Sequence, residues 1–349
     1  MSLVNIHDQK LPKLSILIPV YNVADYLVDC LTSLLKQVDH QVEIIALDDA
    51  SSDGCTKILQ DLQKHYPQLQ VIYQKQNFGV SAARNNLKKY AKGEYIWFID
   101  SDDIVREGAY EVILQAIDEF YGVDVIIGDY YLWEPAKQNA LRLEKTFLGR
   151  TNVKLDNIEN SFLFNLNKLR KNYIWCHIYN RHLLDKVEFP SRARFEDIFF
   201  ITDISILCNS YVYISHPLVN YRSRPNSSTT SKKSCSYIND YLSAFLYRSQ
   251  KLKSNIQMEP SKKAYMYYKI YNNYVGTLKN IGQDATLTLD EKSELIRYID
   301  QNFKVEFDHI YEQCFKTVDI FRRLLLRKKQ KNSQKYYLQY LLMDISAAS

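Results

Sequence analysis

The first hundred residues alternate between short apolar runs and segments in which leucine and other apolar residues recur at helical spacing. Short apolar runs closed by polar residues or proline are typical of buried strands. Strands that alternate with helices favour β-α-β units and a parallel sheet. The predicted strands cover 14–20, 42–47, 69–73 and 95–99, and the predicted helices between them cover 25–37, 56–65 and 80–91.

Polar clusters follow the first, second and fourth of these strands. Pro19-Val20-Tyr21-Asn22 closes the first strand, Asp48-Asp49 opens the cluster after the second, and Asp100-Ser101-Asp102-Asp103 follows the fourth. In open α/β sheets the carboxyl ends of the strands form the crevice where ligands bind. Three loops that are distant in sequence are therefore predicted to converge on one site.

The Asp100–Asp103 cluster is the strongest chemical signal of the three. Carboxylates crowded at a strand end repel one another unless a cation compensates them. Mg²⁺ and Mn²⁺ prefer oxygen ligands and commonly bind one or two carboxylates together with substrate phosphates. The cluster predicts a divalent metal site, and an acidic surface turn is the alternative.

The other two clusters offer groups that suit a nucleotide. The carboxylates of Asp48 and Asp49 can accept hydrogen bonds from a base N–H or a ribose hydroxyl. Tyr21 can lie flat against a base, and Asn22 offers both a donor and an acceptor. Ser51 to Asp53 fit a turn and the N-cap of the next helix.

The segment Asn77–Asn85 combines a glycine turn, small residues and Arg84 at the start of a predicted helix. A helix N-terminus favours anions, and arginine binds phosphate or carbonyl oxygens through a planar fork. A close-packed helix with a surface arginine is the alternative.

Further along the chain, 123–127, 195–201 and 211–221 are predicted as strands, and the sequence becomes helical from about residue 236. We expect a nucleotide-binding half at 1–105, an acceptor-side half at 106–230 and a helical region at 231–349. The helices predicted in that last region cover 236–254, 261–281, 289–303, 308–328 and 334–345.

Four of these segments, in order over about ninety residues, resemble glycosyltransferase family 2. The resemblance implies the GT-A fold, a Rossmann-like, mostly parallel mixed sheet flanked by helices, here with a C-terminal all-helical extension. It also implies a nucleotide-diphospho-sugar donor, usually UDP-linked, and inversion at the anomeric carbon. The segments are Ile18–Asn22, Asp48–Gly54, Gly79–Asn85 and Asp100–Asp103.

The resemblance also implies roles for single residues. Pro19, Tyr21 and Asp49 would hold the base, and Arg84 would hold the base or the ribose. Asp100 would meet the ribose. The Mn²⁺ or Mg²⁺ ion would bind Asp102, with Asp103 as a second candidate ligand.

The likeness continues more weakly to about residue 230. Phe195-Glu196-Asp197 is similar to the family's Glu-Asp pair, whose aspartate is the usual general base, and a helix N-terminus is the alternative for this pair. Tyr221–Ser227 resembles a family segment that folds over the donor diphosphate, which makes Arg222, Arg224 and Ser227 candidate phosphate ligands. His177 stands where relatives often carry lysine, and a packed histidine is the favoured interpretation.

Charge and composition bound the location and the partners. A net charge of +5 is too small to argue for nucleic acid. The six cysteines are scattered without metal-ligand spacing, which predicts reduced thiols in a cytoplasmic protein, and neither a signal peptide nor a membrane span is expected. Residues 320–343 contain lysine and arginine but no Asp or Glu, which favours contact with an anionic bilayer over a packed helix with a solvated basic face.

The predicted function is transfer of a sugar to a lipid-linked glycan acceptor in cell-surface polysaccharide synthesis at the inner face of the membrane. Teichoic-acid or protein glycosylation by the same chemistry is an alternative. A non-catalytic nucleotide-sugar-binding subunit is another. A nucleotidyltransferase is disfavoured, because such enzymes usually carry a glycine-rich loop where this chain has Pro19–Asn22.

Overall fold

The computed structural model describes residues 11–135, 140–157, 161–169, 172–191, 193–224, 233–255, 258–317 and 320–341. The chain forms two compact units. The first combines residues 1–157, 173–192 and 207–224, and the second combines 158–172, 193–206 and 225–349.

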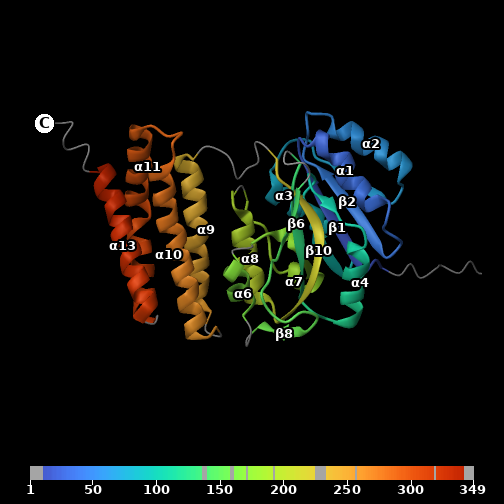
Figure 1. Cartoon of the computed structure of the whole chain (residues 1–349). Helices are drawn as coiled ribbons and strands as arrows, with labels where there is room; N and C mark the ends of the chain where they lie inside the picture. The colour runs from blue at the N-terminus through green and yellow to red at the C-terminus, as the bar shows by residue number, and fades with distance from the viewer. Residues whose placement is uncertain are drawn as a thin grey trace, which may run out of the picture. The chain divides into compact units, whose positions relative to one another are not determined.

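The first unit is built on one mixed sheet (Figure 1). Among the described residues this sheet has ten strands, with the order β3-β2-β1-β4-β9-β6-β10-β5 along its main path. β7 pairs with β6, and β8 pairs with β10. β3, β2, β1 and β4 are mutually parallel, whereas β9 is antiparallel to both β4 and β6. The strands are β1 (Leu14–Val20), β2 (Val42–Asp48), β3 (Leu69–Tyr73), β4 (Tyr95–Phe98), β5 (Ile104–Val105), β6 (Val125–Glu134), β7 (Ala140–Glu144), β8 (Lys154–Asp156), β9 (His177–Asn180) and β10 (Ser210–Arg222).

Helices cover the sheet because its central strands are apolar on both faces. Successive side chains of a strand point to opposite faces. Ile16 and Ile18 of β1 belong to a core cluster that also includes Leu31 of α1 and Ile113 of α4. α3 also packs against β1 and β2 and buries Leu87. The helices of this unit are α1 (Ala24–Leu35), α2 (Cys55–His65), α3 (Val80–Tyr90), α4 (Ala109–Glu119) and α7 (Arg181–Leu184), with a 3-10 turn at Ile174–Cys176.

The second unit is helical, and α9, α10, α11 and α13 lie side by side in it (Figure 1). α10 packs against α12 and α13, and α11 packs against α13. Its core uses tyrosine: the rings of Tyr274 and Phe307 stack with centroids 4.4 Å apart, and Tyr271 is fully buried. The helices are α6 (Phe162–Leu169), α8 (Glu196–Leu207, whose last residue belongs to the first unit), α9 (Cys235–Ser254), α10 (Pro260–Gln283), α11 (Leu289–Asn302), α12 (Lys304–Thr317) and α13 (Ile320–Leu341).

Most predicted elements are confirmed, and two predictions are wrong. The segment 195–201 was predicted as a strand but belongs to the start of α8, because a short run of Phe and Ile fits a buried helix as well as a strand. The helices predicted at 308–328 and 334–345 are instead α12 and α13, and neither glycine nor proline marks the division between them. Among the described residues, no helix is long and apolar enough to cross a membrane. All six cysteines are free thiols.

Candidate active site

The strand order brings the loops after β1, β2 and β4 to one edge of the sheet. β1 lies between β2 and β4, with Val20 paired to Asp48. The amide of Asp49 donates to the carbonyl of Val20 (2.9 Å). The convergence predicted from the sequence is therefore present in the first unit.

The loops after β1 and β2 hold each other in place. The amide of Ser52 donates to the side-chain oxygen of Asn22 (2.8 Å), and the amide of Asn22 donates to Ser51 Oγ (3.1 Å). Asn22 has a positive φ of 51° and Tyr21 beside it is 48% exposed, whereas Pro19 is buried in β1. Tyr21 therefore presents its ring to solvent, and Asn22 is also exposed although its side-chain oxygen accepts from Ser52.

Asp48 and Asp49 are both almost fully buried, and their oxygens accept protein hydrogen bonds. Asp48 accepts from the amide of Ser51 (3.0 Å). Asp49 accepts from Gln74 Nε2 (2.6 Å) and from the amides of Phe78 (2.9 Å) and Gly79 (2.8 Å). Asp49 thereby holds the glycine turn that starts α3, a role that the sequence pattern did not indicate, and contact of either carboxylate with a nucleotide stays a prediction.

Arg84 of α3 forms an ion pair with Asp100, the first residue of the acidic turn Asp100–Asp103. Arg84 Nη2 lies 2.9 Å from Asp100 Oδ1. The guanidinium also lies over the ring of Phe189, 5.4 Å from its centroid. The side chain of Arg84 is 6% exposed and that of Asp100 is 32% exposed. Asp100 is therefore the partner that presents its carboxylate to solvent.

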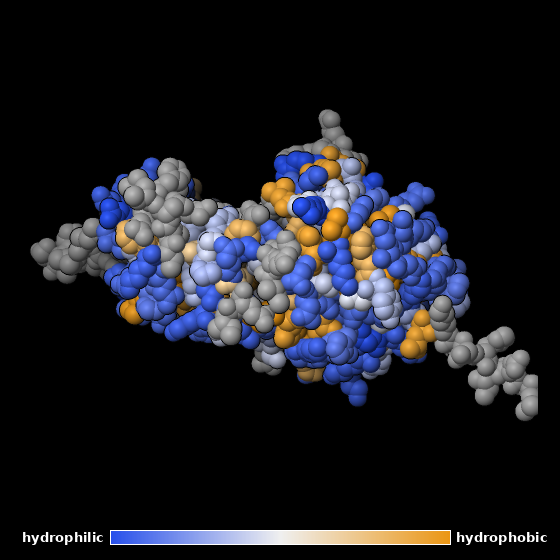
Figure 2. Space-filling model, turned by 90° about the horizontal axis from the view of Figure 1, so that it is seen from below, coloured by the Kyte–Doolittle hydropathy of each residue, from blue (hydrophilic) through white to orange (hydrophobic). Residues whose placement is uncertain are grey.

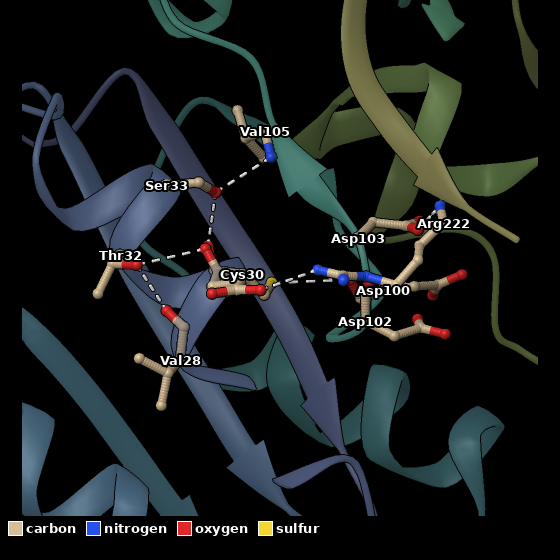
Figure 3. A network of polar contacts seen from close by, with 10 residues as sticks. Val28, Cys30, Thr32, Ser33, Asp100, Asp102, Asp103, Val105 and Arg222 are labelled. Atoms are coloured by element: carbon tan, nitrogen blue, oxygen red, sulfur yellow. Dashed lines mark hydrogen bonds and ion pairs between the residues drawn. The ribbon is translucent and has the colours of Figure 1, made fainter. Parts of the chain in front are cut away.

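The acidic turn crowds three carboxylates beside β10 (Figure 3). Burial raises the pKa of Asp102, and the negative charge of Asp100 raises it further, while Arg224 opposes both effects. Burial, followed by the charges of Asp102 and Asp100, holds the pKa of Asp103 well above its usual range. Burial and the crowding of carboxylates therefore disfavour the ionised forms of Asp102 and Asp103.

The two candidate metal ligands differ in exposure. The side chain of Asp102 is 17% exposed and forms an ion pair with Arg224. Asp103 is fully buried, and its Oδ1 accepts from the amide of Arg222 (2.8 Å). Its Oδ2 has no hydrogen-bond partner within the described part of the chain. This orphaned oxygen and the crowded charges fit a divalent cation.

In the residues that the structure describes, no group of three or more His, Cys, Asp or Glu side chains is arranged to hold a metal by itself. An ion at the acidic turn would therefore need further oxygen ligands from a substrate or from water. Mg²⁺ is commonly held in this way, by one or two carboxylates and substrate phosphates.

Arg222, at the end of β10, is committed to contacts within the protein. Its Nε donates to the carbonyl of Asp102 (2.9 Å), and its Nη2 pairs with Asp29 of α1 (3.2 Å). Its guanidinium lies between the rings of Tyr26 (5.1 Å) and Trp133 (4.2 Å). Because its side chain is only 9% exposed, Arg222 braces the acidic turn.

Arg224 is the more open of the two candidate arginines, with 28% of its side chain exposed. It lies over Tyr26 at 5.4 Å and pairs with Asp102. Tyr26, Asp29 and Trp133 take part in this network but form no recognisable motif in the sequence. Ser227, the third candidate in this segment, lies outside the described residues.

Asp197 belongs to the second unit, where it occupies the first turn of α8 and is half-buried. Its Oδ1 accepts from the amide of Ile198 (2.8 Å). His177, in the first unit, is fully buried in β9, and burial lowers its pKa to about 4. His177 is therefore a neutral, packed histidine at physiological pH, in line with the interpretation favoured from the sequence.

A mixed sheet with an acidic turn at the ends of its parallel strands is the arrangement of the GT-A fold. Residues 15–184 match the model of the family described as Glycosyl transferase family 2. This matched segment, which is just under half of the chain, carries the glycosyltransferase family 2 domain that the order of the four segments indicated.

Relatives with known names agree with this assignment. The glycosyltransferase GlyG of Streptococcus pneumoniae is 29% identical over 66% of this chain and 78% of its own length. The poly(ribitol-phosphate) beta-glucosyltransferase of Bacillus spizizenii is 32% identical over 52% of this chain, but this covers only 27% of the relative. The crystal structure of S. aureus TarS 1-349 in complex with UDP-GlcNAc superposes with a TM-score of 0.68 over 93% of this chain and 89% of that one, at 19% identity. This last similarity shows a shared fold.

Proposed function

We propose that this glycosyltransferase moves a sugar from a UDP-sugar to an acceptor hydroxyl with inversion at the anomeric carbon. The observation that carries the proposal is the acidic turn, where Asp102 is paired with the partly exposed Arg224. A nucleoside diphosphate offers Arg224 a stronger anionic partner than a single carboxylate does. The UDP-GlcNAc complex of the similarly folded TarS supports UDP as the nucleotide.

The proposed reaction is a single displacement. Asp197 accepts the proton of the acceptor hydroxyl as its oxygen attacks the anomeric carbon. The bond from that carbon to the phosphate oxygen breaks, and its electron pair leaves with the nucleoside diphosphate. Arg224 binds the departing phosphate oxygens.

A divalent cation fits this scheme at Asp102, with Asp103 as the second candidate ligand. When bound, such an ion stabilises negative charge on the diphosphate. Arg84 is proposed to contact the base or ribose and Asp100 the ribose, and Tyr21 offers its exposed ring to the base. The proposed nucleotide site is completed by Asp48, Asp49, Asn22 and Pro19.

A donor panel tests the enzyme assignment. Release of UDP or GDP from several nucleotide-sugars is measured with Mn²⁺, with Mg²⁺ and with EDTA. We expect turnover with a UDP-sugar that stops in EDTA and returns when the metal is restored. Binding of UDP without turnover of any donor, in the presence of acceptors, would instead favour a non-catalytic nucleotide-sugar-binding subunit.

The acceptor is proposed to be a growing cell-surface glycan, lipid-linked in the first instance. The name of the poly(ribitol-phosphate) beta-glucosyltransferase relative favours a teichoic-acid polymer as a second candidate. These acceptors are distinguished by measuring transfer of a labelled sugar to lipid-linked glycans, to poly(ribitol phosphate) and to soluble protein. Transfer to soluble protein alone would contradict both.

We also propose that α13 contacts an anionic membrane surface by charge. Lys328, Lys331 and Lys335 are exposed on this helix, whereas Leu326 is buried against the protein. The side of the molecule in Figure 2 carries hydrophilic side chains over most of the described helical part at the left. The exposed lysines are therefore suited to electrostatic contact with an anionic surface.

Replacing Lys328, Lys331 and Lys335 by glutamine is expected to weaken binding to vesicles that contain anionic lipid, by about 1 kcal/mol for each residue near the surface. Sedimentation with vesicles of neutral and anionic composition measures the effect. The matched control replaces the exposed lysines 57, 64 and 186 of the first unit. Equal binding of the two triple variants would contradict the proposal.

A further inference from the structure

Arg248 of α9 is an arginine without solvent exposure. Its Nε donates to Thr202 Oγ1 (2.8 Å), and its Nη2 donates to the carbonyl of Ile198 (3.0 Å) and to Asn172 Oδ1 (3.1 Å). A buried charge is costly unless it is paired and hydrogen-bonded. Two of these acceptors belong to α8, so the guanidinium ties α9 to the first turns of that helix.

Asp197 immediately precedes Ile198, whose carbonyl accepts from Arg248, and its negative charge acts on the guanidinium. Burial lowers the pKa of Arg248 to about 10, and the negative charge of Asp197, followed by Tyr241, opposes this change. Arg248 is therefore a cation at physiological pH. Because the interaction is mutual, the cation favours the ionised form of Asp197, which is the form that a general base requires.

A second contact of α9 involves Phe195, which stands two residues before Asp197 in the sequence. Phe195 has a positive φ of 60°, which is strained for a bulky side chain. Its ring packs against the rings of Tyr237 and Tyr241 of α9, with centroids 5.1 Å and 5.0 Å away. Strained backbone persists only where its surroundings enforce it, and it clusters at functional sites.

These contacts come from one face of α9. Residues 237, 241, 245 and 248 recur at helical spacing, and the Arg248 guanidinium also lies over the ring of Phe245 (5.9 Å). One turn further along α8, Asp203 accepts from Tyr247 (2.7 Å) and pairs with Lys251 (3.0 Å). Contacts from α9 therefore hold Ile198, Thr202 and Asp203 of α8 in position.

We propose that α9 sets the position and charge of the general base, with Arg248 as the positioning residue behind Asp197. This inference rests on the proposed function, because it assigns Arg248 a role only through Asp197. It makes the C-terminal helical region part of the catalytic apparatus.

Arg248→Gln in the full chain is the main test. We expect the folded variant to lose about 10²-fold in kcat, since small misplacements of a catalytic group have effects of this size. Affinity for UDP is expected to stay within about twofold of wild type, because the loss falls on a step after donor binding. The acidic limb of the pH–rate profile is expected to move to higher pH, because the cation that favours the carboxylate is gone.

Arg248→Lys keeps the charge but not the planar fork. It is expected to lower kcat while leaving the acidic limb near its wild-type position. Lys253→Gln removes an exposed charge from the last turn of the same helix and is the matched control. Circular dichroism and thermal unfolding show whether each variant is folded.

Thr202→Val keeps the inference testable if Arg248→Gln does not fold, because it leaves Arg248 in place and removes the acceptor of Arg248 Nε together with the hydrogen bond from Thr202 Oγ1 to the carbonyl of Ile198. We expect a loss of about tenfold in kcat for this variant, the lower end of what disturbing a supporting contact costs. A folded Arg248→Gln or Thr202→Val protein with wild-type kcat would overturn the inference. A parallel loss of kcat and UDP affinity would do the same, because it would indicate a general structural effect.

The double variant with Asp197→Asn separates this inference from the proposed function. If Arg248 acts through Asp197, its replacement adds little to the loss caused by Asp197→Asn alone. Additive losses would count against the inference. Near-normal activity of Asp197→Asn itself would instead show that the base lies elsewhere and would refute that part of the proposed function.

Discussion

Replacing Asp197 by asparagine is expected to lower kcat by about 10²- to 10⁴-fold, the usual contribution of a general base. Asparagine keeps the shape of the side chain but cannot accept the proton of the acceptor hydroxyl. Affinity for UDP should remain near wild type, because binding of the donor does not use this proton transfer. Initial rates of UDP release and calorimetric binding of UDP measure the two quantities separately.

Asp290→Asn is the matched control for this variant. Asp290 also occupies the first turn of a helix, α11, and is exposed. A change in the helix dipole interaction alone would therefore affect both variants alike. If Asp197→Asn were no slower than Asp290→Asn, Asp197 would be a helix-terminal residue without a catalytic role.

Replacing Asp102 by asparagine is expected to reduce kcat by about 10²- to 10³-fold and to abolish the response to added Mn²⁺. Loss of several kcal/mol of charge stabilisation at the diphosphate accounts for an effect of this size. The variant also removes the carboxylate that faces Arg224. UDP release measured across a range of Mn²⁺ concentrations tests the expectation.

Asp185→Asn, at the exposed end of α7, controls for loss of one negative charge in the same unit. Asp103→Asn tests the second carboxylate, whose Oδ1 already accepts from the amide of Arg222. A normal metal response in Asp102→Asn, together with a lost response in Asp103→Asn, would move the metal site to Asp103.

The sequence predicted the sheet well because local patterns determine its central strands. The limits of β1 and β3 match the predicted ranges, since each is a short apolar run bounded by polar residues or proline. The convergence of three loops followed from the parallel order of the strands, which the alternation with helices indicated. The same local reasoning failed at α8, where an apolar run is buried as a helix.

The partners of the site residues could not be predicted, because they depend on contacts between distant segments. Asp49 was assigned to a nucleotide, yet it holds the amides of Phe78 and Gly79, about thirty positions away. Arg222 was assigned to phosphate, yet it packs between two aromatic rings. Arg248 lies in a helix with no motif around it. Only the folded chain shows that it reaches α8.

The tie between Asp103 and Arg222 also bears on the order in which the protein acquires activity. These residues are separated by 119 positions, and within the described part of the chain the adjoining β5 pairs with β10 alone. Contacts between residues so distant in sequence form late in folding, because closing the intervening loop costs conformational entropy before any contact can form. A nascent chain that has emerged only as far as Asp103 holds all four motifs of the proposed nucleotide site but lacks β10, whose Arg222 braces the acidic turn. The emerging polypeptide therefore cannot complete the proposed metal and diphosphate site until most of the first unit has been synthesised.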